Sequence, residues 1–116
     1  MLERRRQARF KRQFSVTFKS KQDVFEGVVR DVSDGGLFII TDKVLPPKST
    51  IDLEFMLFSG EPINCRGTII WVNNGQLETY PPGFGVEFLE IDGHDLSRLI
   101  TFNGGDLRNQ SFFLSA

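Results

Sequence analysis

The sequence predicts a small antiparallel β-barrel with one helix across its end and a basic arm ahead of it. Three observations predict this fold. The chain has 116 residues, enough for one domain with a real core. Six segments with strand-like patterning follow one another with short connections, and one helical segment comes after them. Six half-buried strands would leave exposed sheet edges unless the sheet closes. We therefore predict an all-β fold with one helix, a six-stranded antiparallel barrel capped by a C-terminal α-helix.

The strand segments are recognised by alternation and by their flanking turns. Apolar and polar residues alternate in 14–18, and the same pattern recurs in 51–57. Gly27 marks a candidate bulge or bend inside its segment. Paired prolines and Asn-Gly indicate the longer loops. The expected strands cover residues 14–18, 24–32, 37–41, 51–57, 63–72 and 84–88.

One helix is expected after the strands. Asp92 is a plausible N-cap, with a second acid, Asp95, three residues on. Gly104-Gly105 should end the helix. The only histidine, His94, falls near the helix start, where we expect an exposed or capping role. The residues expected on one helical face are Leu96, Leu99, Ile100 and Asn103.

Composition is that of an ordinary globular protein, with 40% apolar and 25% charged residues. Phenylalanine supplies 12 aromatic residues against one Trp and one Tyr, so we expect a core built on Phe. Cys65 is the only cysteine and cannot form an internal disulfide. No apolar run reaches the length of a membrane span, and none follows the basic residues as in a signal peptide. We expect a cytoplasmic protein without membrane insertion.

The charge is unevenly distributed, which divides the chain into three parts. Residues 1–12 hold six basic and one acidic side chain, a net charge of +5, so the other 104 residues carry −6 of the total −1. We expect residues 1–12 to be a flexible basic arm, 13–103 the barrel with its helix, and 104–116 a tail. The apolar tail residues 112–114 would pack on the barrel or a partner, or belong to a disordered end. The basic arm predicts an anionic partner.

No convincing catalytic constellation is present. The chain has neither a Ser/His/Asp set nor a phosphate loop, and it lacks Cys/His clusters with metal-ligand spacing. The Gly-x-Gly in "PPGFGVEF" lies in a strand pattern without the helix that a dinucleotide site needs. We therefore expect a binding protein, not an enzyme, with no cofactor and no metal.

Two short segments carry binding chemistry. The arm contains Arg5-Arg6-Gln7-Ala8-Arg9, and arginine binds phosphate or a guanine edge in bidentate fashion. The second segment is "DVSDGG", from Asp31 to Gly36. By itself, its combination of Asp, Ser and Gly is typical of a tight turn. Asp31 is also an acceptor suited to the N1–H and N2–H₂ donors of guanine. Ser33 can donate to a phosphate or a base, and Gly36 would let a ligand approach the backbone.

Taken together, the two segments resemble the PilZ domain family, receptors for the bacterial second messenger cyclic di-GMP. The family pairs R-x-x-x-R in an N-terminal arm with [D/N]-x-S-x-x-G after a strand hairpin, matching Arg5–Arg9 and Asp31–Gly36. The stretches "ERRRQARF", "GTIIWV" and "PPGFGVEF" are similar to further parts of the family pattern, so the resemblance spans about residues 3–102.

The resemblance implies a protein that changes conformation when it binds cyclic di-GMP. Arg5 and Arg9 would grip guanine edges and phosphates, Asp31 and Ser33 would hold the other guanine face, and Gly36 would keep the strand start open. The arm would change conformation on binding and signal to a partner protein in trans. The full implied ligand set is Arg4, Arg5, Arg6, Arg9, Asp31, Ser33, Gly35, Gly36 and Trp71.

Several points stay open. Family members with an arginine at the position of Arg4 tend to take up two stacked ligands, which implies an intercalated cyclic di-GMP dimer. Trp71 lies where the family often has an aromatic residue near the ligand, but a core position fits equally well. Arg30 and Arg66 are possible neighbours that the sequence cannot place, and Asp34 is expected to point outward.

Two other functions compete. One is a PilZ-like interaction module of a pilus or motility system that binds no nucleotide, although such members usually lack the arginine pair. The other is a small barrel that binds single-stranded nucleic acid through its arm. The charge of −6 on the body disfavours that reading, so we expect no nucleic-acid polymer as partner.

Overall fold

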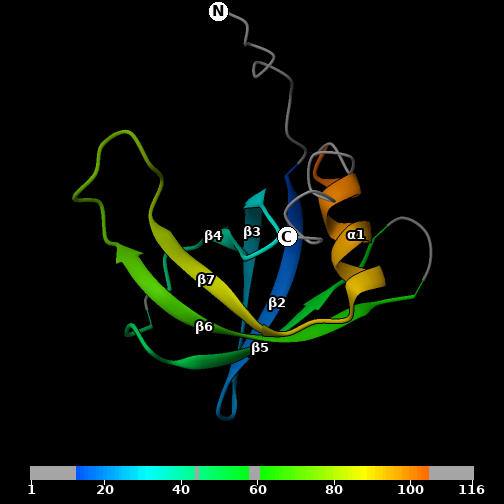
Figure 1. Cartoon of the computed structure of the whole chain (residues 1–116). Helices are drawn as coiled ribbons and strands as arrows, with labels where there is room; N and C mark the ends of the chain where they lie inside the picture. The colour runs from blue at the N-terminus through cyan, green and yellow to red at the C-terminus, as the bar shows by residue number, and fades with distance from the viewer. Residues whose placement is uncertain (1–12, 44, 58–60, 105–116) are drawn as a thin grey trace, which may run out of the picture.

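A computed structural model describes residues 13–43, 45–57 and 61–104, which form a six-stranded antiparallel sheet and one helix (Figure 1). The predicted arm of residues 1–12, with its four candidate arginines, lies outside the described residues, as does the tail from Gly105 onward. The elements in order are β2 (Phe14–Ser20), β3 (Asp23–Val32), β4 (Gly36–Ile40), β5 (Thr50–Phe55), β6 (Ile63–Asn73), β7 (Gly83–Glu90) and α1 (Gly93–Phe102).

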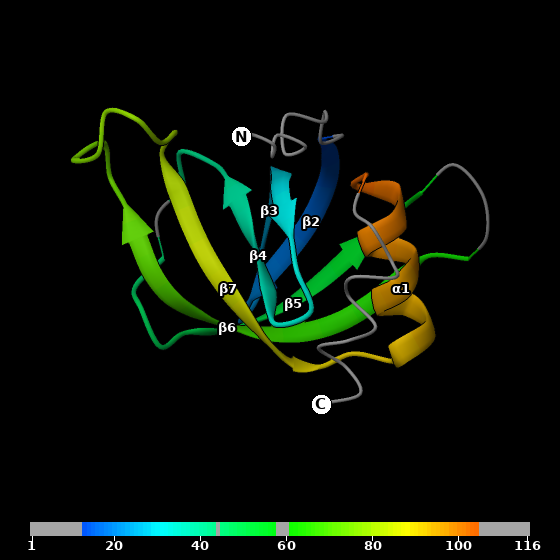
Figure 2. The same ribbon diagram turned by 45° about the horizontal axis from the view of Figure 1, so that its top comes forward.

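The sheet is closed, as predicted. Its strand order is β2-β3-β4-β7-β6-β5, and every neighbouring pair is antiparallel. Closure comes from β5, which returns to β2 and places Leu53 opposite Phe18. Figure 2 shows the strands curling around a common interior, with α1 lying across one end of the barrel. The closed sheet leaves no long unpaired edge between the first and last strands in space.

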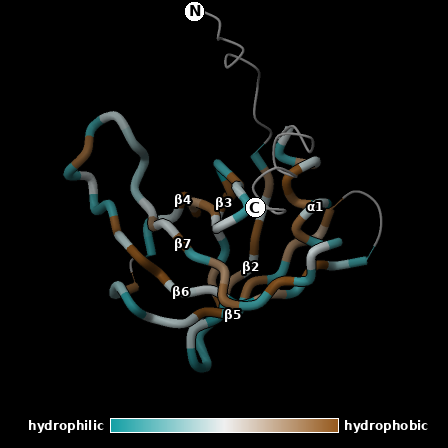
Figure 3. Tube along the Cα trace, in the orientation of Figure 1, coloured by the Kyte–Doolittle hydropathy of each residue, from teal (hydrophilic) through white to brown (hydrophobic). Residues whose placement is uncertain are grey.

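The core is built on phenylalanine and aliphatic side chains. Phe18, Phe55 and Phe84 are the largest fully buried side chains. The rings of Phe18 and Phe84 meet edge to face with centroids 5.4 Å apart, a favourable geometry for aromatic pairs. Strict alternation in β2 and β5 sends every second side chain inward. Apolar positions follow the strands and α1 in Figure 3, whereas the β2–β3 turn at the bottom of the view is hydrophilic.

Helix α1 begins and ends where its sequence signals predict. The Asp92 side chain accepts hydrogen bonds from the backbone N–H groups of His94 (2.8 Å) and Asp95 (3.4 Å). Its apolar face is buried against the barrel, and Phe102 meets the ring of Phe14 edge to face at 5.2 Å. Gly104 follows with φ +96°, which ends the helix. The helix therefore closes the end of the barrel where β2 begins.

The predicted bulge at Gly27 is wrong. Gly27 pairs in regular register with Val16, and a Cβ atom there would lie 2.6 Å from Cγ2 of Ile39. Close packing inside the barrel therefore explains this glycine. The bulge of β3 lies at Arg30, between the pairs Val29↔Ile39 and Asp31↔Phe38. Strand β5 also ends at Phe55, two residues before the predicted end at Leu57.

Candidate functional site

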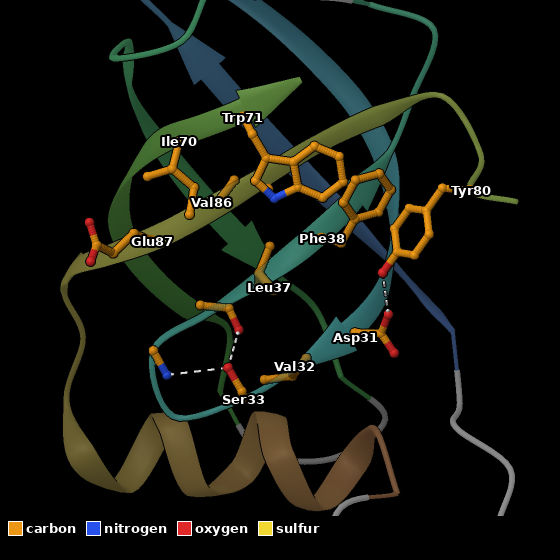
Figure 4. Close-up of a pocket in the computed structure, with 13 residues that line it drawn as sticks. Asp31, Val32, Ser33, Leu37, Phe38, Ile70, Trp71, Tyr80, Val86 and Glu87 are labelled. Atoms are coloured by element: carbon orange, nitrogen blue, oxygen red, sulfur yellow. Dashed lines mark hydrogen bonds between the residues drawn. The ribbon is translucent and has the colours of Figure 1, made fainter. Parts of the chain in front are cut away.

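A pocket of about 460 Å³ opens on the outer face of the barrel, where the β3–β4 turn lies beside β6 and β7. Its size falls in the range of ordinary small-molecule sites. Figure 4 shows its labelled side chains, which come from β3, β4, β6 and β7, from the β3–β4 turn and from the β6–β7 loop. The residues that line it are Asp31, Val32, Ser33, Gly35, Gly36, Leu37, Phe38, Ile70, Trp71, Tyr80, Gly85, Val86 and Glu87.

Two β-bulges aim side chains into this pocket. Without the bulge at Arg30, Asp31 would follow Val29 onto the inner face of the barrel, because side chains alternate along a strand. Val32 is buried in the core instead, so Asp31 points outward. The same shift occurs in β6 between Ile69 and Trp71, which leaves Trp71 38% exposed. Both bulges thus convert an inward position into a position of the site.

The β3–β4 turn is held by its own polar groups. The Ser33 N–H donates to the Gly36 carbonyl (2.9 Å), and the Ser33 hydroxyl donates to the same oxygen (3.3 Å). The Gly35 N–H donates to the Ser33 hydroxyl at 3.4 Å. A Cβ atom on Gly36 would overlap the Val86 carbonyl oxygen of β7. The segment is therefore a structured turn that also lines the pocket, and Gly36 is required by the close approach of β4 and β7.

An aromatic cluster forms the wall opposite the turn. The rings of Phe38, Trp71 and Tyr80 all contact one another. The centroid of Phe38 lies 5.3 Å from that of Trp71 and 4.8 Å from that of Tyr80, and the Trp71 and Tyr80 centroids are 5.8 Å apart. A Cβ atom on Gly85 would overlap the indole nitrogen of Trp71, so this glycine leaves room for the Trp71 side chain. The cluster gives the pocket an apolar wall with exposed indole surface, which suits the stacking of a planar base.

Asp31 is part of a small polar network at the edge of this cluster. Its Oδ2 atom accepts a hydrogen bond from the Tyr80 hydroxyl at 3.1 Å (Figure 4) and lies 3.8 Å from Nε of Arg30. The Arg30 guanidinium also lies over the Tyr80 ring, 4.6 Å from its centroid. Burial raises the pKa of the Tyr80 phenol, and the charge and hydrogen bond of Asp31 raise it further, while Arg30 lowers it.

Two buried asparagines support the site from behind. Asn103, at the C-terminal end of α1, accepts from the Val32 N–H (3.2 Å) and donates to the Arg30 carbonyl (3.3 Å). It thereby satisfies backbone groups on both sides of Asp31, next to the bulge. Asn73, at the end of β6, donates to the carbonyls of Tyr80 and Pro81, each at 3.0 Å. Its Oδ1 also accepts from two N–H groups of the same loop, those of residues 75 and 77.

The structure brings together five of the nine predicted ligand residues: Asp31, Ser33, Gly35, Gly36 and Trp71. The other four, Arg4, Arg5, Arg6 and Arg9, lie outside the described residues. Arg30 borders the pocket through Asp31, whereas Arg66 lies on the β5–β6 side, 3.3 Å from Asp52. The described residues that line the pocket do not include Asp34.

Sequence reasoning missed Tyr80, Phe38 and Gly85. Tyr80 is the only tyrosine of the chain and stands directly before Pro81-Pro82, but these features alone indicate a loop and not a site. Phe38 falls in the expected strand 37–41, where nothing in the sequence marks it apart from its apolar neighbours. Gly85 read as part of a strand, and its function depends on Trp71, which faces it across the β6–β7 ladder.

Two further observations concern the described residues as a whole. Within residues 13–43, 45–57 and 61–104, no three His, Cys, Asp or Glu side chains gather closely enough to hold a metal ion. None of the described residues belongs to a helix that is long and apolar enough to cross a membrane. His94 is exposed at the start of α1, as predicted.

Comparison with known proteins gives one finding about the family of this chain. No curated protein matches the chain significantly. The sequence pattern of the PilZ domain, in contrast, matches residues 3–104, which include both motifs, all six strands and the helix. This match covers well over half of the 116 residues. The chain therefore belongs to the PilZ domain family.

Proposed function

We propose that this protein is a cyclic di-GMP receptor. The observation that carries the proposal is the convergence of Asp31, Ser33 and Trp71 on one pocket beside the turn motif. The PilZ family is in general a family of cyclic di-GMP receptors and not of enzymes, although some members bind no nucleotide. The pocket combines a carboxylate acceptor, a hydroxyl and an exposed indole, the groups that a guanine base can use.

Each group has a defined task in this proposal. The Asp31 carboxylate accepts from guanine N1–H and N2–H₂, and the Ser33 hydroxyl reaches the ligand from the turn. Trp71 offers its ring face for stacking, a contact worth about 1–3 kcal/mol per base. Gly35 and Gly36 carry no side chain, so the ligand can approach the backbone of the turn closely. The chemistry is recognition of a planar base with a polar edge.

The charge of the pocket argues that the N-terminal arm takes part. Among the described residues that line it, Asp31 and Glu87 are acidic and none is Lys or Arg. Cyclic di-GMP carries two phosphates, so the described wall alone would repel it. The +5 charge of residues 1–12 supplies the missing cations. In this proposal Arg5 and Arg9 bind guanine edges and phosphates, with Arg4 and Arg6 beside them.

The proposal includes a signal. Binding would draw residues 1–12 over the barrel, which changes the surface offered to a partner protein. The arginine at position 4 further predicts an intercalated ligand dimer, two ligand molecules per chain. Because cyclic di-GMP is an intracellular bacterial messenger, the proposal also places the protein in the bacterial cytoplasm.

Calorimetry with cyclic di-GMP tests the proposal. Wild type should bind two ligands per chain, and Asp31→Ala and Arg9→Ala should each weaken binding about tenfold or more, because each removes a guanine contact. Asp34→Ala is the matched control, since it deletes the same side chain from the same turn and should leave affinity within about twofold.

The possible results separate the alternatives. The absence of heat with folded wild type would favour a PilZ-type interaction module that binds no nucleotide. Unchanged binding by both Arg9→Ala and Asp31→Ala would show that the ligand lies elsewhere. A stoichiometry of one would exclude only the intercalated dimer.

A further inference from the structure

Tyr80 occupies the acceptor on which the proposed site depends. Its hydroxyl donates to Oδ2 of Asp31 at 3.1 Å, and the Arg30 guanidinium covers its ring at 4.6 Å. Arg30 also lies 3.8 Å from the same carboxylate oxygen. Each of the three side chains therefore contacts the other two at the edge of the pocket. Figure 4 shows the hydrogen bond between Tyr80 and Asp31.

The placement of Tyr80 is built into the fold. It lies on the loop between β6 and β7, and Asn73 binds that loop at four points through its buried side chain. Two of these bonds reach the carbonyls of Tyr80 and Pro81 directly. The ring also packs edge to face on Phe38. These contacts therefore hold the loop in the position where the Tyr80 hydroxyl reaches Asp31.

A guanine edge and the Tyr80 hydroxyl use the same carboxylate. A guanine that donates through N1–H and N2–H₂ engages both oxygens of a carboxylate, so one of its bonds must go to Oδ2. The Tyr80 hydroxyl already takes one of the acceptor positions of that oxygen, and Arg30 lies on the same atom. A site that is open for only a fraction of the time binds with an apparent affinity reduced by that fraction. Contact of Tyr80 with Asp31 therefore opposes entry of the base.

We propose that Tyr80 is an intramolecular competitor that sets the affinity of this site, because its hydroxyl competes with guanine for Oδ2 of Asp31. The inference rests on the proposed function and adds an affinity-setting residue that lies outside both arginine and turn motifs. Removal of the hydroxyl alone should strengthen binding, whereas removal of a ligand contact would weaken it. The sign of the change is therefore diagnostic.

Titration of Tyr80→Phe with cyclic di-GMP provides the main test. Phe keeps the ring that packs on Phe38 and lies under Arg30, and it deletes only the donor. We expect binding about 3- to 10-fold tighter than wild type, the equivalent of one modest hydrogen bond. Equal or weaker binding by a folded Tyr80→Phe protein would overturn the proposal, because Tyr80 would then be neutral or a ligand contact.

A second measurement needs no ligand. Tyr80 is the only tyrosine, so tyrosinate absorbance near 295 nm reports its ionisation alone. Burial and Asp31 both raise the pKa of this phenol. Asp31→Ala should therefore lower the midpoint of the absorbance titration, and Asp34→Ala should leave it unchanged. An equal midpoint in wild type and Asp31→Ala would show that the contact is absent in solution and would overturn the proposal.

The two measurements distinguish failure of the competitor from failure of the receptor. If neither wild type nor Tyr80→Phe binds cyclic di-GMP, the proposed function falls and the competitor role falls with it. If both bind with equal affinity, the receptor stands and only the role of Tyr80 is wrong. Binding by Tyr80→Phe but not by wild type would support both.

Discussion

The two glycines of the β3–β4 turn differ in what surrounds them. Gly35 and Gly36 are adjacent, and both line the pocket. A Cβ atom on Gly35 would meet nothing within 4 Å, whereas one on Gly36 would overlap the backbone of β7 at Val86. The second glycine is thus required by the pairing of β4 with β7, independently of any ligand.

The two glycines form a matched pair for a stability experiment. Gly36→Ala should lower the free energy of unfolding by about 1–3 kcal/mol. The new methyl group would clash with the backbone carbonyl of Val86, which cannot move aside as a flexible side chain can. Gly35→Ala makes the same chemical change into open space and should leave stability nearly unchanged. Urea unfolding measures both, and equal stabilities would show that the β4–β7 approach is looser than described.

Cys65 gives a prediction for the dependence of stability on pH. Burial raises the pKa of this thiol to about 12, with a smaller contribution from Asp95. The native thiol therefore keeps its proton, while the unfolded chain loses it above about pH 8.5. A raised native pKa means stability that is complete below the unfolded pKa and lost as pH rises towards 12.

The expected result is a difference between wild type and Cys65→Ala. Between pH 8 and 10 the free energy of unfolding should fall more steeply for wild type, because only wild type carries the thiol. Native Cys65 should also react slowly with iodoacetamide until the protein unfolds. Parallel pH profiles of the two proteins would show that the thiol is accessible in the native state.

At the scale of elements, the bulge of β3 and the end of α1 act together. The bulge at Arg30 turns Asp31 outward, and Asn103 binds the Arg30 carbonyl and the Val32 N–H on either side of it. The strand is therefore held in its bulged register by a residue 71 positions later in the chain than Val32. The end of α1 thus stabilises the bulge that positions Asp31 in the candidate site.

Asn103→Ala should weaken both the fold and the site. The substitution leaves two backbone groups without these partners in a buried place, at a cost of about 1–3 kcal/mol in the free energy of unfolding. The affinity for cyclic di-GMP should fall as well, because Asp31 loses its support. Asn74→Ala removes the same side chain from an exposed loop position and is the control. Equal thermal unfolding of the two variants would contradict this role for Asn103.

At the scale of the whole molecule, closure of the barrel rests on its shortest ladder. Strands β2 and β5 share three paired positions, whereas β2 and β3 share seven. Opening a short ladder breaks few hydrogen bonds, so local fluctuations should concentrate there. The seam between β2 and β5 is therefore the expected weak point of the closed sheet.

Native-state hydrogen exchange followed by NMR tests this expectation. Amides that bond across β2 and β5 should exchange faster than those across β6 and β7, which share seven paired positions. Both ladders belong to the same barrel, so global unfolding contributes equally to each. Equal protection of the two ladders would show that the barrel opens only as a unit.

Much of this architecture follows from local sequence signals. Alternation in Phe14–Phe18 and the N-cap at Asp92 depend on neighbours in the chain, and both predictions are confirmed. The closed barrel followed from the need of six strands to pair their edges. The turn motif placed Asp31, Ser33 and Gly36 together because they are adjacent in sequence.

Features that depend on distant contacts could not be predicted. The bulge was expected at Gly27, but the backbone groups of Arg30 and Val32 bind Asn103 of a helix that forms far along the chain. For Trp71, the family resemblance left a position near the ligand and a core position equally open, and the bulge after Ile69 places the side chain at the surface. Tyr80 carried no signal, because its partner Asp31 lies 49 residues away.

The sequence by itself determined the fold class, the family motifs and the contrast between a basic arm and an acidic body, since these are properties of composition and short-range pattern. The tertiary structure alone decided which side chains of β3 and β6 face outward and which residues lie beside the turn "DVSDGG" there. The physical reason is register: one extra residue in a strand moves every following side chain to the opposite face, and contacts with other elements decide where that residue goes.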